Sequence, residues 1–256
     1  MNFKLGNKEF ETVIYETNEE KKVGYIILNR PEKHNALSYQ LLDDLDAVFD
    51  HAEADRSVNV IVLKANGKSF CSGFDLKGSY YLTPPKGGWK YRNSFEILRK
   101  KIYAKYPRIL NFPKVTIAQV HGYCTDAGCY LQLLCDITVA ADDAILGHPA
   151  QRWGGTQSLG IWQLYLGVKK ARYLLMSGRT ITGKEAAEMG LVSISVPREK
   201  LEEEVDKLAA EIAEIPADGA LLNKIAMNLD LKMRGIDVLF EYYGEMNRLG
   251  RLFSLR

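Results

Sequence analysis

Residues 121–136 read HGYCTDAGCYLQLLCD and follow an apolar segment, Thr116–Val120, that is predicted to be a β-strand. A glycine turn after this strand opens directly into an apolar helix. The start of a helix leaves several backbone N–H groups without intrahelical partners, and the helix dipole adds positive potential there. Such a site favours negative charge, including charge that develops on a carbonyl oxygen during a reaction. We therefore expect an anion-stabilising site at this turn.

Strand-like and helix-like segments alternate on both sides of this stretch. Ser38 is placed to cap a helix over residues 38–53, in which apolar residues recur at helical spacing. Residues 78–93 are rich in glycine, proline and aromatic residues, which predicts a surface loop able to cover a pocket. The expected strands are Val23–Leu28, Val58–Leu63, Val115–Val120 and Ile137–Ala140. This alternation predicts an α/β fold with mainly parallel strands.

The character of the chain changes after Val196-Pro197, where only helical patterns follow. Amphipathic stripes occupy residues 201–212 and 221–229, and a third helical segment covers about 236–248. We therefore expect an α/β core over residues 1–196 and a helical region over residues 197–256. Helices that bury little against their own core often pack on a neighbouring subunit.

Composition narrows the class of protein. Among 256 residues, 46% are hydrophobic, and the net charge of +2 argues against a nucleic-acid partner. The first ten residues lack the long apolar run of a secretory signal, so we expect none, and no apolar run is long enough to predict a membrane span. The cysteines are Cys71, Cys124, Cys129 and Cys135. They form no Cys-x-x-Cys pair, so we expect buried free thiols, no metal site and a cytoplasmic location.

Four segments in order identify a family. Leu28-Asn29-Arg30-Pro31 with Asn35-Ala36-Leu37 comes first, then residues 67–77 (GKSFCSGFDLK), then the stretch quoted above, then residues 177–192. Together they resemble the crotonase superfamily, also called the enoyl-CoA hydratase/isomerase family. The resemblance runs from about Val23 to Pro197. It implies a crotonase-like ββα spiral core, a helical C-terminal oligomerisation region, and a homotrimer or dimer of trimers.

The resemblance also implies a site for an acyl-CoA thioester. The backbone N–H groups at the positions of Phe74 and Ala127 would form an oxyanion hole around the thioester carbonyl. Coenzyme A enters as part of the substrate, and no separate cofactor is expected. The groove for its adenine and pantetheine parts would be lined by Lys33, His34, Ala36, Ser72, Leu76 and Lys77. For Lys33 and Lys77 the alternative is an ordinary surface lysine.

The two catalytic glutamates of the family's hydratases are absent. Tyr130 and Ala150 occupy the matching positions. Alanine cannot move a proton, and a tyrosine with a pKa near 10 is a poor base at neutral pH. We therefore do not expect the two-glutamate hydration mechanism.

Three residues are candidates to move a proton instead: Asp126, Tyr130 and His148. Each has a structural alternative, since Asp126 or Thr125 can cap the helix, Tyr130 can simply pack, and His148 can be a hydrogen-bonded structural imidazole. Asp75 is expected to fix its own turn.

We expect an acyl-CoA-processing enzyme of the enoyl-CoA hydratase/isomerase type, a lyase or isomerase that stabilises a thioester enolate. Two alternatives stay open. One is a hydrolase of a thioester or carbon–carbon bond on the same fold, with His148 as the base. The other is a non-catalytic acyl-CoA-binding subunit.

Overall fold

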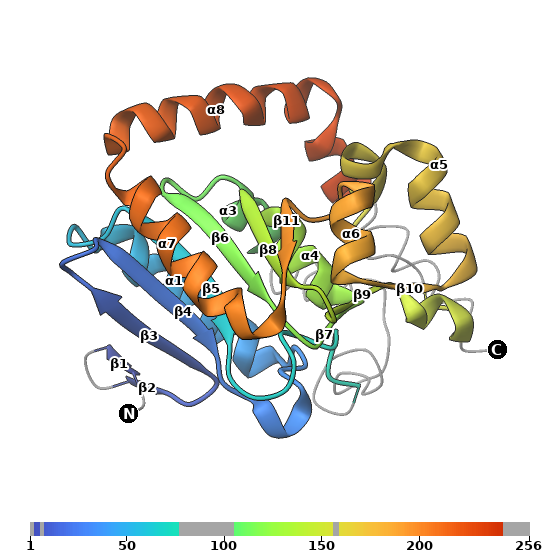
Figure 1. Cartoon of the computed structure of the whole chain (residues 1–256), viewed down its shortest axis with the longest axis horizontal. Coiled ribbons are helices and arrows are strands. Elements are labelled where there is room, and N and C mark those ends of the chain that lie inside the picture. Colours follow the sequence, from blue (N-terminus) through green and yellow to red (C-terminus); the bar gives the residue numbers. More distant parts are fainter. Residues whose placement is uncertain (1–2, 6–7, 77–104, 156–158, 243–256) are drawn as a thin grey trace, which may run out of the picture.

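A six-stranded sheet forms the centre of the molecule (Figure 1). The computed structural model describes residues 3–5, 8–76, 105–155 and 159–242. The strand order is β11–β8–β6–β5–β4–β3, and the pairs are parallel except for β3 with β4. The strands are β3 (Val13–Asn18), β4 (Val23–Leu28), β5 (Val60–Ala65), β6 (Val115–Val120), β8 (Ile137–Ala141) and β11 (Ile194–Val196). The predicted α/β class is confirmed.

Helices cover both faces of this sheet. Helix α7 (Leu201–Ala213) packs across β4, β5, β6 and β8, and α1 (Tyr39–Ala54) packs against β3 and β4 from the other face (Figure 1). The side chain of Ser38 accepts a hydrogen bond from the Leu41 N–H, so the predicted cap of α1 is confirmed. Strands buried on both faces read as continuous apolar runs, which explains the composition of β5.

A smaller sheet carries the stretch that begins the candidate site. Its order is β10 (Thr180–Thr182), β9 (Ile145–Gly147) and β7 (Tyr123–Thr125). Sequence analysis did not predict these short strands, and β7 shows that the residues before the helix are a strand rather than only a turn. Helix α4 (Ala127–Leu134) follows β7, and all its residues are buried. The other elements are β1 (Phe3–Leu5), β2 (Lys8–Phe10), η1 (Pro31–Lys33), α3 (Tyr106–Leu110), η4 (Pro149–Trp153), α5 (Trp162–Ser177), α6 (Gly183–Met189) and η5 (Arg198–Lys200).

Helix α8 (Ala217–Met233) turns polar residues toward the core. Lys224 and Asn228 are buried, and the Lys224 ammonium donates to the Asp136 carboxylate at 2.7 Å. Much of the predicted apolar stripe faces outward, with Leu222 66% and Ile225 55% exposed. Within the described residues, no helix is both long enough and apolar enough to cross a membrane. The predicted loop 78–93 and the predicted helix beyond residue 242 lie outside the described residues.

Candidate active site

The loop after β5 runs beside the strand that leads into α4. The Phe70 N–H donates to the His121 carbonyl at 2.8 Å, and the Cys71 N–H donates to the Tyr123 carbonyl at 2.9 Å. The Thr125 N–H donates back to the Cys71 carbonyl at 3.0 Å. Two segments about fifty residues apart in the chain are therefore fixed next to each other by backbone hydrogen bonds.

Glycines allow the close approach of these segments. A Cβ atom at Gly128 would lie 2.2 Å from the Cys71 carbonyl oxygen, so only glycine fits there. Gly73 has φ +107°, and a Cβ on it would lie 3.6 Å from the Ala127 nitrogen. The main chain around Gly73-Phe74 therefore lies against the first residue of α4. The structure brings together the two predicted positions, Phe74 and Ala127.

Backbone bonds hold the Phe74 turn in place. The Leu37 N–H donates to the Gly73 carbonyl at 2.7 Å, and the Asp75 N–H donates to the Leu37 carbonyl at 3.0 Å. Ala127 is buried and is the first residue of α4, where backbone N–H groups have no intrahelical acceptor. The positive end of the α4 dipole lies at the same place.

The loop that carries Lys33 and His34 lies beside the same turn. The Ser72 N–H donates to the His34 carbonyl at 3.0 Å, and the His34 ring lies 3.0 Å from the Ser69 hydroxyl. Lys33 is exposed, Leu76 is 60% exposed, and Ala36 is buried. The loop after η1 and the residues around Ser72 therefore form one surface. Lys77 lies outside the described residues.

An ion pair that the sequence analysis missed links these loops. The Asp75 carboxylate accepts from the Arg30 guanidinium at 2.9 Å, and Arg30 also donates to the Ala36 carbonyl at 2.6 Å. The Asp75 carboxylate therefore binds the neighbouring loop, a contact beyond its own turn that the sequence did not predict, and its role in that turn stays a prediction. The buried Asn35 amide adds bonds to the Asn66 and Ser69 carbonyls. Arg30 and Asp75 are 45 residues apart along the chain, so no local sequence pattern predicts their ion pair.

Asp126 does not cap α4, although the sequence favoured that role. Its side chain makes no capping bond, and its backbone has φ 50° and ψ −118°. The carboxylate instead accepts from the Ala150 N–H at 3.1 Å and lies 2.9 Å from His148 Nδ1. Ala150, the position of the missing second glutamate, is thus bonded to Asp126 through its backbone.

Tyr130 and His148 lie next to each other in the interior. Tyr130 is fully buried, and its ring centroid lies 6.2 Å from that of Tyr106 and 6.4 Å from that of His148. His148 is 3% exposed, and neither ring nitrogen has a hydrogen bond of normal geometry among the described residues. The structure therefore brings the three predicted proton-moving residues together. The 2.9 Å contact between His148 Nδ1 and the Asp126 carboxylate does not separate a catalytic from a structural imidazole, so both stay predictions.

The four cysteines are free and buried, as expected. Burial raises the pKa of the Cys71 thiol to about 12, with smaller effects from its neighbours, and burial likewise raises that of Cys135 to about 12. A protonated thiol is a weak nucleophile, so neither residue suits covalent catalysis.

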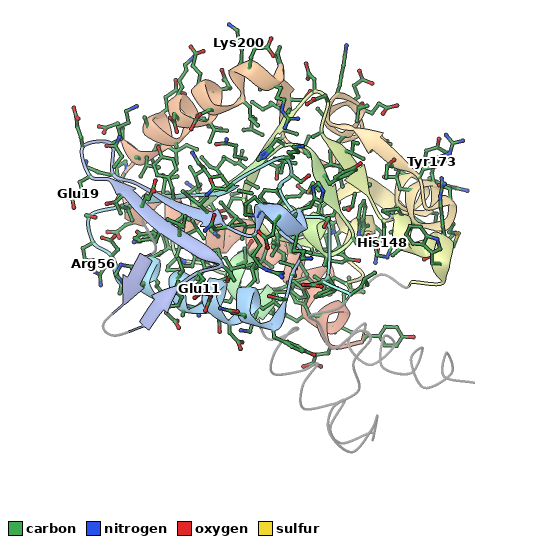
Figure 2. All side chains as sticks on the ribbon, turned by 90° about the horizontal axis from the view of Figure 1, so that it is seen from below. Glu11, Glu19, Arg56, His148, Tyr173 and Lys200 are labelled. Atoms are coloured by element: carbon green, nitrogen blue, oxygen red, sulfur yellow. The ribbon has the colours of Figure 1, made fainter. Side chains whose placement is uncertain are left out.

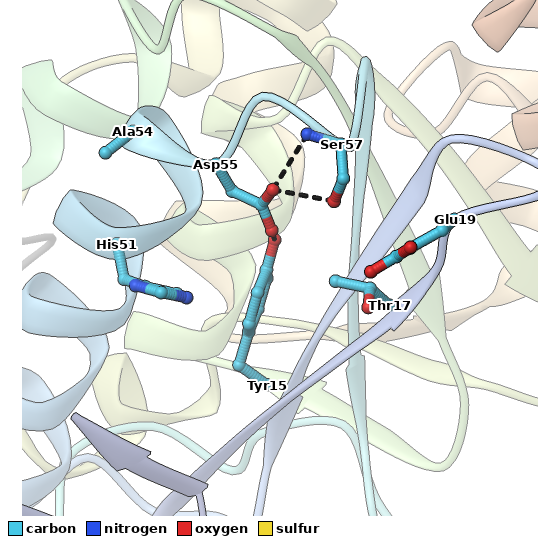
Figure 3. A pocket seen from close by; sticks show the side chains of 7 residues that line it. All are labelled: Tyr15, Thr17, Glu19, His51, Ala54, Asp55 and Ser57. Carbon is cyan, nitrogen blue, oxygen red and sulfur yellow. Dashed lines mark hydrogen bonds between the residues drawn. The ribbon is translucent and has the colours of Figure 1, made fainter. Parts of the chain in front are cut away.

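A separate polar pocket of about 530 Å³ lies between β3 and the end of α1 (Figure 3). The Tyr15 hydroxyl donates to Asp55 at 2.8 Å, and the other oxygen of Asp55 accepts from the backbone and hydroxyl of Ser57. Glu19, which lines this pocket, lies on the opposite side of the molecule from His148 (Figure 2). The pocket therefore belongs to the packing of β3 on α1 and not to the candidate active site.

Comparison with known proteins places the chain in a family. A family model described as enoyl-CoA hydratase/isomerase matches residues 18–241. A probable enoyl-CoA hydratase from Rhizobium meliloti is 33% identical over 234 residues, which cover 88% of this chain and 84% of that protein. The crystal structure of a probable enoyl-CoA hydratase from Mycobacterium thermoresistibile has a TM-score of 0.85 and 33% identity, covering 95% of this chain and 98% of that one. An enoyl-CoA hydratase/isomerase from Xanthobacter autotrophicus has a TM-score of 0.85 and 31% identity, covering 94% and 87% of the two chains. The chain therefore belongs to the enoyl-CoA hydratase/isomerase family, within the crotonase superfamily.

Proposed function

We propose that this protein is an acyl-CoA-processing lyase or isomerase that stabilises a thioester enolate between the backbone N–H groups of Phe74 and Ala127. The observation that carries the proposal is the close approach of the Gly73 main chain to the first residue of α4, with 3.6 Å between the Gly73 Cβ position and the Ala127 nitrogen. Two donors from different segments would then converge on one carbonyl oxygen.

Main-chain donors suit this role because they do not depend on the side chains that they carry. When a proton leaves the carbon next to a thioester, negative charge moves to the carbonyl oxygen, where preorganised N–H groups stabilise it. Removing one such donor typically costs about 2.7–4 kcal/mol of transition-state stabilisation. Phe74 and Ala127 can therefore act with the two glutamates absent, and the proton is left to Asp126, Tyr130 or His148.

The coenzyme A part of the substrate would lie along the loop after η1 and the residues around Ser72. We assign this groove to Lys33, His34, Ala36, Ser72, Leu76 and Lys77. The hydrogen bond from the Ser72 N–H to the His34 carbonyl supports a continuous surface there. The proposed reaction needs no metal ion and no cofactor beyond the coenzyme A of the substrate. We further propose that the enzyme acts in the cytoplasm.

We propose a homotrimer or a dimer of trimers with α8 at the subunit contact. In support, α8 buries Lys224 and Asn228 against its own chain while Leu222, Ile225 and Leu229 are more than half exposed. An apolar stripe of this length on a surface helix favours association. Light scattering that gives a monomer at micromolar concentration would contradict this assembly.

Turnover of enoyl-, dienoyl- and β-oxoacyl-CoA thioesters tests the proposal. We expect double-bond hydration or migration with at least one enoyl chain. Hydrolysis of a thioester or β-oxo substrate alone would instead identify a hydrolase, for which the Asp126–His148 contact also provides a base. Tight binding of the thioesters without turnover would identify a non-catalytic binding subunit.

A further inference from the structure

Asp126 has a backbone conformation that aspartate does not favour. Its φ of 50° and ψ of −118° lie in a region populated mainly by glycine. Backbone bonds impose this conformation, because the Asp126 N–H donates to the Gly147 carbonyl at 2.9 Å and its carbonyl accepts from the Cys129 N–H at 3.1 Å. Glycine would meet the same constraints with less strain. Backbone strain at a candidate site indicates a function for the residue that bears it, here the carboxylate of Asp126.

The carboxylate connects the parts of the site. It accepts from the Ala150 N–H at 3.1 Å and lies 2.9 Å from His148 Nδ1, and its own residue directly precedes Ala127. One oxygen atom thus makes both contacts. The Asp126 carboxylate therefore lies between His148, the Ala150 backbone and the start of α4.

The backbone that precedes His148 is fixed as well. The Gly147 carbonyl, which precedes it, also accepts from the Cys129 thiol at 3.5 Å. Both ring nitrogens of His148 are buried without a hydrogen bond of normal geometry among the described residues; Nδ1 lies 2.9 Å from the Asp126 carboxylate, and Nε2 has no partner there. A buried polar atom without a partner is costly in a structure that only has to be stable. Catalytic hydrogen bonds, by contrast, often form only when the substrate is in place.

We propose that His148 is the acid–base residue and that Asp126 is a positioning residue that orients it through Nδ1. The inference rests on the proposed function. Nε2 takes a proton from the carbon next to the thioester carbonyl, and the C–H electron pair moves to the carbonyl oxygen held by Phe74 and Ala127. The imidazolium beside Asp126 then donates a proton to that carbon or, in an enoyl chain, to the far end of the conjugated system, and exchange of the imidazolium proton with solvent between the two transfers carries deuterium onto the substrate. Because one proton leaves and one is added without the addition of water, this step corresponds to migration of a double bond, and isomerisation is the reaction class that we infer.

Exchange of the α-protons of butanoyl-CoA and octanoyl-CoA into D₂O, followed by NMR, measures the first step alone. We expect exchange with the wild-type protein, a loss of at least about 100-fold in His148→Gln, and about 10-fold or more in Asp126→Asn. His51→Gln changes a histidine on α1, outside the site, and should exchange like wild type. Asp126→Gly is informative because it should raise the melting temperature by relieving strain while exchange falls.

The split between binding and rate separates a positioning role from a structural one. Asp126→Asn should lower the exchange rate at saturating thioester while the thioester concentration that gives half of the maximal rate stays like wild type, because the carboxylate contacts His148 Nδ1 and the Ala150 N–H. A folded Asp126→Asn protein that loses thioester binding together with exchange would contradict the positioning role.

The exchange experiment distinguishes a failure of this inference from a failure of the proposed function. If a folded His148→Gln protein exchanges like wild type, the inference is wrong while the proposed function stands. If the wild-type protein neither binds the thioesters nor exchanges their protons, the proposed function itself is wrong.

Discussion

Gly128→Ala tests the contact between α4 and the Cys71 segment, on which the proposed oxyanion hole depends. The added Cβ would lie 2.2 Å from the Cys71 carbonyl oxygen and 2.9 Å from its carbonyl carbon, whereas real Cβ contacts essentially never fall below 3.0 Å. Both atoms are backbone, so no side-chain rotation relieves the clash. The start of α4 and the Cys71 segment must therefore separate by roughly 1 Å, and a shift of that size can lower turnover about 100-fold.

The same separation should lower stability. Overpacking a core costs about 1–3 kcal/mol, and the upper end applies because backbone has to move. Urea unfolding gives the loss of stability, and α-proton exchange of butanoyl-CoA gives the loss of function. Gly219→Ala is the matched control, because Gly219 lies in α8 with no atom within 4 Å of the added Cβ. It should stabilise by about 0.5–1 kcal/mol and leave exchange unchanged. A Gly128→Ala protein as stable and as active as wild type would refute the close contact.

Three further predictions concern the rest of the molecule. Lys224→Met should lower the free energy of unfolding in urea by about 2–3 kcal/mol, because it breaks the buried ion pair with Asp136. The loss is smaller than is usual for a buried pair because Asp136 keeps its hydrogen bonds from Thr116. If the loss is no larger than in the exposed control Lys232→Met, the ion pair does not hold α8 on the core. Asp55 is partly desolvated, which raises its pKa, but hydrogen bonds from Ser57 and Tyr15 and the positive charge of Lys114 together outweigh this and hold the pKa below its ordinary value. Its contribution to stability is therefore present above about pH 4 and lost below it, and unfolding from pH 3 to 7 should show a smaller loss in Ser57→Ala, by about 1 kcal/mol. The four buried thiols should resist a thiol reagent at pH 8 until the protein unfolds, and a fast-reacting thiol in the native protein would show that burial is incomplete.

The sequence predicted the elements that repeat a simple physical pattern. Strands β4 and β6 begin and end as expected, because runs of branched apolar residues bounded by polar loops have few alternatives. Strand β5 begins two residues later than expected, at Val60. Val58 is buried like a strand residue but precedes the ladder, and the N–H groups of residues 59 and 60 both donate to the Lys22 carbonyl instead.

The sequence could not predict features that depend on distant backbone. An aspartate before an apolar helix predicts a cap, but the bond to the Gly147 carbonyl turns the Asp126 side chain toward His148. Three-residue strands such as β7 and β9 carry too little pattern to be recognised without their partners. The resemblance to the family identified the positions of Phe74 and Ala127, and only the structure gives the contact between their segments.

A crystal structure with a bound acyl-CoA, or with an unreactive thioester analogue, tests the central claim most directly. The proposed mechanism predicts a carbonyl oxygen about 2.7–3.1 Å from the backbone nitrogens of both Phe74 and Ala127. A thioester carbonyl bound elsewhere, or one that contacts neither nitrogen, would contradict it.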